Sequence, residues 1–432
     1  MKSYIKSARL LALALSLGFF TACDKDDAGG LPSQLTPDAD NGGLTLPGDF
    51  GAITVKEQTA PGRHIAVNSN GDIYLRLSQL MNGNGIVLLK DNNNDGRADT
   101  ETSFGNFTGT GIAIKNGYLY ASSDNEIFRY RLNANNEIED PNAPERIVTG
   151  LTAGSQHSSK SIVLDDQQNI YVNIGAPSNS CQVDDRMPGS PGQDPCPLLP
   201  TAGGIWRFNA NTPDQTQAMG TRYATGLRNV VGLDWNTSVN SLYVMQHGRD
   251  QLSFLFPGLY TDSMSAELPS EEFFRVSEGQ DFGWPYCYFD HLQNKKLLAP
   301  EYGGDGLITG RCDAVEKPIL AFPGHWAPNA LLFYTGNQFP PRYRNGAFIA
   351  FHGSWNRAPL RQGGYFVAFV PMSNGLPSGN WEVFAAGFPG VDIITEPDQA
   401  QYRPVGLAQG PDGSLFISDS KAGRIWRIIY KG

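Results

Sequence analysis

A unit of two short apolar strands joined by a tight turn recurs along the chain, and this repeat constrains the fold most. The copies begin at His64, Gly111, Ser161, Val231, Ala330 and Val405. Several are followed by a third strand-like run, as in EIFRYRL, GGIWRFN, GYFVAFV and GRIWRII. Six such units at spacings of roughly 50 to 100 residues are typical of propeller blades, each a small antiparallel sheet. We therefore expect an all-β, six-bladed β-propeller, because a β-sandwich fits a repeated three-strand unit poorly.

The turns and the composition support many short strands. The turn sequences NG, NGD and PDG are those of tight hairpins, and the 432 residues include 49 glycines and 29 prolines. Three long insertions, at residues 178–202, 252–270 and 288–318, interrupt the repeat. Insertions of this kind usually lie on one face, where they shape a binding cleft.

The N-terminus has the pattern of an export signal. Lys2, Lys6 and Arg9 precede an apolar run at residues 10–20, and the segment Thr21-Ala22-Cys23 follows. Small residues before a cysteine resemble the bacterial lipoprotein cleavage box. We expect a lipoprotein signal peptide at 1–22, a lipid anchor on Cys23, a solvated tether at 23–50 and the propeller at 51–432. Cleavage of an ordinary signal near Ala22 is the alternative. The mature protein is expected at the cell envelope, on the periplasmic side or the cell surface.

The remaining cysteines favour disulfides. Lipidation of Cys23 leaves four cysteines in an oxidising compartment. Sequence proximity favours the pairs Cys181–Cys196 and Cys287–Cys312. The sequence contains no C-x-x-C pair of the kind that binds metals, and no C-x-x-C-H motif of the kind that attaches a c-type haem. The formal net charge of −10 argues against nucleic acid as a partner.

The loop from Asp91 to Asp99 resembles a calcium loop. Its oxygen-bearing side chains alternate around Gly96, but Thr102 occupies the position where a bidentate glutamate is expected. A loop closed by its own Asx hydrogen bonds is the alternative.

Six motifs in order resemble one family. The segments are SQHSSKSIVLDDQQNIYVNIG, GLRNVVGL, QHGRD, EEFFRVSEGQDFGWPYCY, HGSWNR and YRPVGLAQGPDGSLFISDSKAGRIWRI. Together they are similar to the soluble sugar dehydrogenases that use pyrroloquinoline quinone (PQQ): the glucose, aldose, sorbosone and pyranose enzymes. The resemblance covers roughly residues 61–430. It implies a six-bladed propeller with the quinone in the central cleft.

The resemblance assigns catalytic roles to His157 and Arg228. His157 matches the family's base, and a neutral imidazole suits removal of a hydroxyl proton near pH 7. Arg228, with Asn229 beside it, matches the arginine that stabilises charge on the quinone. A loop histidine and a surface arginine at a blade edge are the structural alternatives.

PQQ carries three carboxylates, which arginine binds well. Arg403 matches a family arginine that contacts the cofactor, and Arg63 and Arg357 are further candidates, with Asn229 beside the quinone. His325 and His352 are expected to line the same cleft. Trp355 is either a stacking residue or part of a blade core.

A calcium ion in the family binds the cofactor and two backbone carbonyls, which align here with Gly248 and Arg249. Arginine in place of proline, the insertion at 252–270, and Val231 where the glucose enzymes have glutamine separate this chain from glucose dehydrogenases proper. HGSWNR and GWPYCY are closer to the sorbosone and pyranose branch.

The sequence therefore predicts a PQQ- and calcium-dependent sugar dehydrogenase that passes electrons to an external acceptor, a quinone or a cytochrome. A calcium-dependent lactone hydrolase and a non-catalytic glycan-binding propeller are the alternatives.

Overall fold

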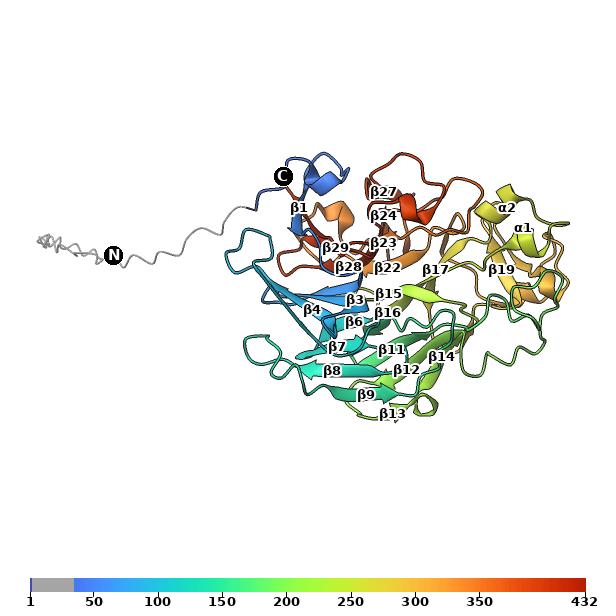
Figure 1. Cartoon of the computed structure of the whole chain (residues 1–432), viewed down its shortest axis with the longest axis horizontal. Helices are drawn as coiled ribbons and strands as arrows, with labels where there is room; N and C mark the ends of the chain where they lie inside the picture. Colours follow the sequence, from blue (N-terminus) through green and yellow to red (C-terminus); the bar gives the residue numbers. More distant parts are fainter. Residues whose placement is uncertain (2–34) are drawn as a thin grey trace, which may run out of the picture. The chain divides into compact units, whose positions relative to one another are not determined.

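The computed structural model describes Met1 and residues 35–432. The packed body is built from six small sheets around a common axis (Figure 1), so the predicted six-bladed β-propeller is confirmed. The predicted signal peptide and Cys23 lie outside the described residues. None of the described helices is long and apolar enough to span a membrane.

The first three blades each begin with one of the predicted repeat units. The first blade consists, inner strand first, of β2 (Gly62–Val67), β3 (Ile73–Met81), β4 (Asn84–Lys90) and β5 (Thr100–Phe104). The second consists of β6 (Ile112–Lys115), β7 (Tyr118–Ser122), β8 (Ile127–Arg131), β9 (Glu145–Thr149) and β13 (Gln215–Thr216). The third consists of β10 (Ile162–Leu164), β11 (Asn169–Ile174), β12 (Gly204–Asn209), β14 (Thr221–Thr225) and β18 (Gln280–Asp281). Tight Asn-Gly turns join some of them: Asn116 and Gly117, between β6 and β7, both have positive φ (50° and 78°), as a two-residue hairpin requires.

The other three blades follow the same order. The fourth blade consists of β15 (Val230–Asn236), β16 (Ser241–Gln246), β17 (Glu271–Val276) and β21 (Leu320–Phe322). The fifth consists of β22 (Pro328–Phe333), β23 (Ala347–Phe351), β24 (Phe366–Val370) and β27 (Glu382–Ala385). The sixth consists of β28 (Pro404–Gln409), β29 (Leu415–Asp419), β30 (Ile425–Tyr430) and β1 (Phe50–Lys56). The last blade closes the ring, because β1 pairs antiparallel with β30, from Phe50 opposite Tyr430 to Lys56 opposite Ile425.

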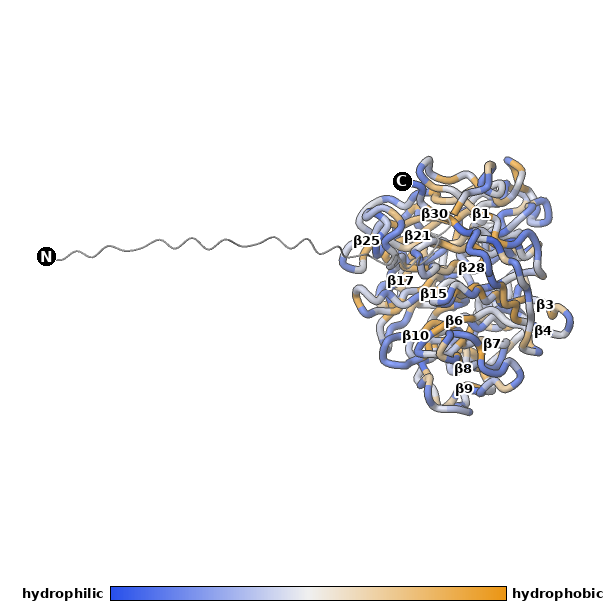
Figure 2. The backbone as a smooth tube through the Cα atoms, turned by 90° about the vertical axis from the view of Figure 1, so that its left-hand side faces the viewer, coloured by the Kyte–Doolittle hydropathy of each residue, from blue (hydrophilic) through white to orange (hydrophobic). Residues whose placement is uncertain are grey.

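Helices and minor hairpins lie in the connections between strands. They are η1 (Asn41–Gly43), η2 (Gln217–Met219), α1 (Leu252–Leu255), α2 (Asp262–Glu267), β19 (Cys287–Asp290), β20 (Lys295–Leu298), η3 (Pro300–Tyr302), η4 (Gly310–Ala314), η5 (Pro341–Tyr343), β25 (Met372–Ser373), β26 (Leu376–Pro377) and η6 (Pro397–Gln399). Figure 2 shows apolar segments mainly along the strands of the body and polar segments mainly along its loops.

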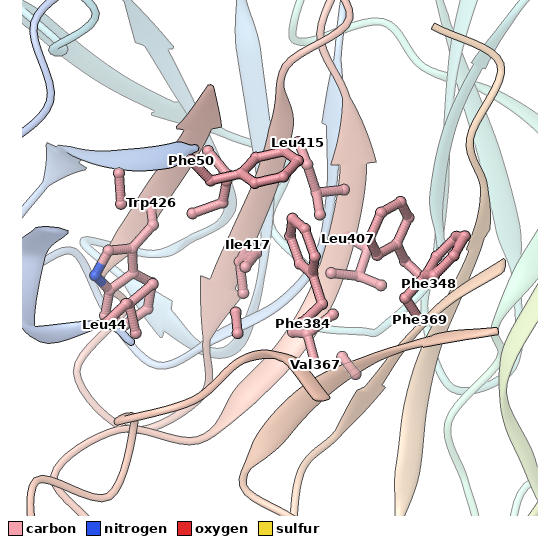
Figure 3. Close-up of a cluster of buried hydrophobic side chains, with 14 of the residues drawn as sticks. Leu44, Phe50, Phe348, Val367, Phe369, Phe384, Leu407, Leu415, Ile417 and Trp426 are labelled. Carbon is pink, nitrogen blue, oxygen red and sulfur yellow. The ribbon is translucent and has the colours of Figure 1, made fainter. Parts of the chain in front are cut away.

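Apolar side chains of neighbouring blades pack against each other. The cluster in Figure 3 joins the fifth and sixth blades, where Phe50 of β1 meets Phe384 of β27 edge-to-face at 5.1 Å between ring centroids. Leu44 lies in the same cluster and is buried. The amide of Asp38 also donates to the carbonyl of Ala52 at 2.8 Å. Residues 35–49 are therefore packed on the propeller, and the expectation of a solvated tether throughout 23–50 is wrong for them. The burial of Leu44 is the physical reason.

The three insertions contact one another. Both predicted disulfides, Cys181–Cys196 and Cys287–Cys312, are present. The Ser180 hydroxyl, in the first insertion, donates to the Glu301 carboxylate of the third at 2.9 Å. Leu252 and Tyr260 of the second pack with Leu297 of the third. The insertions thus form one structure beside the blades, near α1, α2 and β19 in Figure 1.

The Cys287–Cys312 bond is expected to stabilise this structure. It closes a loop with a sequence separation of 25 residues, for which the chain-entropy model gives about 3.5 kcal/mol. Replacing both cysteines by alanine should lower the free energy of unfolding by about 2–4 kcal/mol, measured by denaturant titration with and without reductant. An unchanged unfolding curve would mean that the contacts between insertions already hold the loop.

Candidate active site

Most of the predicted site residues gather at one mouth of the central channel. In every blade the inner strand begins where the second strand ends, so both termini present side chains at the same end. Arg63, Asn229 and Arg403 lie at or just before the start of their inner strands, and His247 and His352 directly follow second strands. The propeller topology thus brings together residues that are hundreds of positions apart in the sequence.

His157 is held as a neutral imidazole at this mouth. It has a positive φ of 52°, and its Nδ1 lies 2.6 Å from the carbonyl oxygen of Ala176. A carbonyl only accepts, so Nδ1 carries the proton and donates, and Nε2 keeps a lone pair. Burial, and then the nearby Arg228 guanidinium, lower the pKa of His157 to about 3. The side chain is therefore able to accept a proton at Nε2.

Arg228 is buried and its guanidinium is fixed by the protein. Nε donates to the Asn179 carbonyl at 3.0 Å, and Nη2 donates to the Asn179 side chain at 2.9 Å and to Asp250 at 2.8 Å. Nη1 donates to the carbonyl of Gly248 at 3.0 Å. These bonds use four of the five N–H groups of an arginine and leave one on Nη1. Arg228 is thus a rigid cation beside His157.

Asp250 connects the loops of this site. Its carboxylate accepts from Arg228 and Arg186, each at 2.8 Å, and from the side-chain amide of Asn356 at 2.8 Å. Burial alone would raise its pKa, but Arg228, His325 and Arg186 hold the pKa well below the usual value. Asp250 is the last residue of the QHGRD motif, and the sequence alone predicts no role for it. Its position between two arginines was not visible from a single segment.

Three cations at the mouth have no ion-pair partner among the described residues: Arg63, Lys160 and Arg403. Their hydrogen-bond acceptors are neutral. Arg63 donates to the hydroxyls of Thr110 and Ser159, each at 3.0 Å, and Arg403 donates to the backbone carbonyls of His352 and Gly353.

Burial lowers the pKa values of these three cations, to about 10 for Arg63 and about 8 for Lys160. After burial, Arg403 and Arg63 also lower the pKa of His352, and Arg403 lowers that of Arg63, so these three side chains lie near one another. Asp124 acts on Arg63 and Lys160 only at longer range. Unpaired cations that converge in this way favour binding of an anion.

Asn229 contributes a free polar atom to the same region. It is buried, and its Oδ1 has no hydrogen-bond partner among the described residues. A Cβ built on Gly175 would lie 3.2 Å from Oδ1, so this amide borders the strand end beside His157. The two ends of an amide are interchangeable by rotation, and the side chain is therefore free to donate or accept toward a ligand.

Arg357 is bonded to protein groups away from the site, unlike Arg63 and Arg403. Its guanidinium donates to the carbonyls of Ala266 and Gly324 and to the carboxylate of Glu267. It therefore braces the second insertion, and the structure does not support its expected contact with the cofactor. The neighbouring Trp355 is 51% exposed, so it is not part of a blade core. His325 is buried: its Nε2 donates to the carbonyl of Ser265 at 2.8 Å, and its Nδ1 accepts from Asn356 at 3.0 Å.

The expected metal ligands form only part of a calcium site. The Arg249 side chain turns away from the Gly248 carbonyl and pairs with Glu301 at 2.5 Å, both buried. The Gly248 carbonyl accepts from Arg228 and keeps one lone pair. A cavity of about 20 Å³ beside it is lined by Arg228 and Arg249, each already in an ion pair, and by Glu272. No group of three or more His, Cys, Asp or Glu side chains among the described residues is placed to hold a metal.

The Asp91–Asp99 loop closes on itself. The carboxylate of Asp91 accepts from the amides of Asp95 and Gly96, and that of Asp99 accepts from Asn92 and Asn93. This is the Asx-bonded arrangement expected as the alternative to a calcium loop.

Comparisons with known proteins agree with this architecture. The model of the TrAA12-like family matches residues 45–431. A PQQ-dependent sugar dehydrogenase of Hypocrea jecorina is 24% identical over 403 residues, which cover 85% of each chain. A protein of Borreliella burgdorferi is 30% identical over 212 residues, so the aligned part spans about half (48%) of each chain.

Two solved structures share the fold. The calcium structure of a Trichoderma reesei enzyme of carbohydrate-active family AA12 has a TM-score of 0.72 at 20% identity and covers 93% of this chain and 99% of its own. The holo form of the PQQ domain of Coprinopsis cinerea pyranose dehydrogenase has a TM-score of 0.71 at 18% identity, with 89% and 97% covered. The chain therefore belongs to the TrAA12-like family, and the membership in the PQQ-dependent sugar dehydrogenases predicted from its motifs is confirmed.

Proposed function

We propose that the protein oxidises a hydroxyl group of an aldose, a ketoaldose or a related sugar, with PQQ bound at the mouth that carries His157. The observation that carries the proposal is the pair Arg63 and Arg403, which act on each other and on His352 and have no ion-pair partner among the described residues. Lys160, a third cation with no ion-pair partner among those residues, lies next to Ser159, the residue to which Arg63 donates. PQQ carries three carboxylates, so its charge complements theirs. The named relatives use this cofactor.

The bound quinone would supply the acceptor for the hydride that leaves the sugar carbon. His157 would take the hydroxyl proton at Nε2, while the Ala176 carbonyl holds its tautomer and stabilises the imidazolium. Arg228 supplies a fixed positive charge where negative charge develops; the protein already orients it, so it needs no rearrangement. Asn229 would orient the cofactor through its free amide.

The two electrons then require an external acceptor, a quinone or a cytochrome, because the sequence has no haem-attachment motif. We also propose that Cys23 carries a lipid anchor and holds the propeller at the cell envelope, as the lipoprotein box predicts. The other candidate enzyme, a calcium-dependent hydrolase, needs several carboxylates on a metal. The described residues contain no such cluster, and no observation favours that function.

Titration of the purified protein with PQQ, followed by dye reduction with aldoses, tests the proposal. Arg403→Gln removes one cation from the site and should weaken PQQ binding about 10- to 100-fold, the range for a lost hydrogen bond to a charged group. Absorbance or tryptophan quenching measures the binding. Arg311→Gln, an exposed arginine paired with Asp194, is the matched control and should bind as the native protein does. Native protein that does not bind PQQ would refute the proposal.

We further propose that calcium binds only together with the cofactor, whose oxygens complete a ligand set that starts at the Gly248 carbonyl. Calorimetry should therefore detect calcium binding at this mouth only when PQQ is present. A chelator should weaken PQQ binding. Equal PQQ affinity in chelator and in calcium would show that the ion is not required.

A further inference from the structure

A second cavity lies at the opposite end of the inner strands from His157. Its volume is about 330 Å³, which is in the range of small-molecule sites. All six inner strands line it. Five of them do so with their C-terminal halves and β6 with its whole length, whereas the residues of the candidate active site lie at the N-terminal ends. The two sites therefore occupy different mouths of the channel.

The wall of this cavity is mainly aliphatic and aromatic, and it contains one acidic side chain. Ile65, Ile112, Val163, Leu332 and Leu407 supply apolar surface from five different blades, and the aromatic residues are Trp235 and Phe333. Asp234, on β15, is the carboxylate among the lining residues. Its two oxygens accept from the backbone amides of Trp235 at 2.8 Å and of Phe333 at 2.7 Å.

Asp234 has no ion-pair partner among the described residues. Lys115 is the other charged residue of the wall, and it is paired with Asp166, so this mouth keeps one uncompensated negative charge. Burial raises the pKa of Asp234 to about 7, against the lowering effects of the two amides and of Lys115. A positive charge that lies next to this carboxylate would relieve its cost of burial.

We propose that this cavity binds a small organic ammonium ion with an apolar body, whose cation pairs with Asp234. The apolar wall would take the hydrocarbon part of the ligand. The volume limits the ligand to one or two rings or an equivalent chain. The site is independent of PQQ, so it stands whether or not the proposed function holds.

Calorimetry with benzylammonium tests this site in the full chain, with benzyl alcohol as the neutral ligand of the same shape. Benzylammonium should bind at least tenfold more tightly than the alcohol at pH 8. Because the carboxylate fraction falls from about 90% at pH 8 to about 10% at pH 6 when the pKa is about 7, affinity should drop about tenfold over that interval. The other charged groups at this mouth are Lys115 and its ion-pair partner Asp166.

Variants test whether benzylammonium binds in the cavity beside Asp234. Asp234→Asn should weaken benzylammonium binding at least tenfold, whereas Asp194→Asn, an exposed acid paired with Arg311 and absent from the wall of this cavity, should leave it within about twofold. Ala113→Phe keeps Asp234 but fills the cavity and should abolish binding, with PQQ binding unchanged. Equal affinity for the alcohol and the ammonium ion would overturn the proposal. So would native affinity in either Asp234→Asn or Ala113→Phe.

Discussion

Replacing His157 by asparagine is expected to lower kcat about 10²- to 10⁴-fold while the protein still binds PQQ. General-base catalysis contributes this range, and the imidazole of His157, whose Nδ1 is bonded to the Ala176 carbonyl, is the base that we propose. Asparagine is the suitable substitution because it tolerates the positive φ of residue 157 better than most other residues. Dye-reduction kinetics measure kcat, and PQQ titration measures cofactor binding.

His291→Asn is the matched control, because His291 lies in the third insertion and its Nδ1 meets the Ser270 hydroxyl. The His291→Asn variant should have the same kcat as the native enzyme. Since the pKa of His157 is lowered to about 3 in the free protein, the base stays unprotonated at pH 5, and kcat/KM should not fall there as it would for an ordinary histidine. Native kcat in His157→Asn would show that another group removes the proton.

Replacing Asp250 by asparagine is expected to destabilise the protein by about 3–5 kcal/mol, the cost of leaving a buried cation unpaired. The change removes the charge that Arg228 and Arg186 share while keeping a similar shape. Arg228 should also lose its fixed orientation, so kcat should fall while PQQ still binds. Denaturant titration measures the free energy of unfolding, and dye reduction measures kcat.

The pH dependence of this effect has a definite sign. The pKa of Asp250 is lower in the folded protein than in the unfolded chain, so its contribution is complete at neutral pH and is lost as pH falls below about 4. The difference between the native protein and Asp250→Asn should shrink over that range. Asp194→Asn, which breaks an exposed ion pair with Arg311, should cost no more than about 1 kcal/mol at any pH. An equally small effect of Asp250→Asn would show that Asp250 is not the counter-charge of Arg228.

The blades were predictable from the sequence because their strands and turns are local. Each of the six repeat units forms the first two strands of a blade, and the two disulfides join cysteines close in sequence. Other features depend on partners distant in the chain. Leu44 packs against the last blades, so residues 35–49 are not a tether. Arg357 pairs with Glu267, 90 residues away, and not with the site predicted for it.

The sequence by itself determined the propeller and the family, because periodic strands, turn residues and ordered motifs are properties of short segments. Only the tertiary structure decided which charges are already neutralised. Asp250 forms ion pairs with Arg228 and Arg186, and Glu301 forms one with Arg249. By contrast, three cations have no ion-pair partner among the described residues: Arg63, Lys160 and Arg403. The physical reason is that the charge available to a ligand depends on which side chains meet when the ring closes, and ring closure joins residues from opposite ends of the chain.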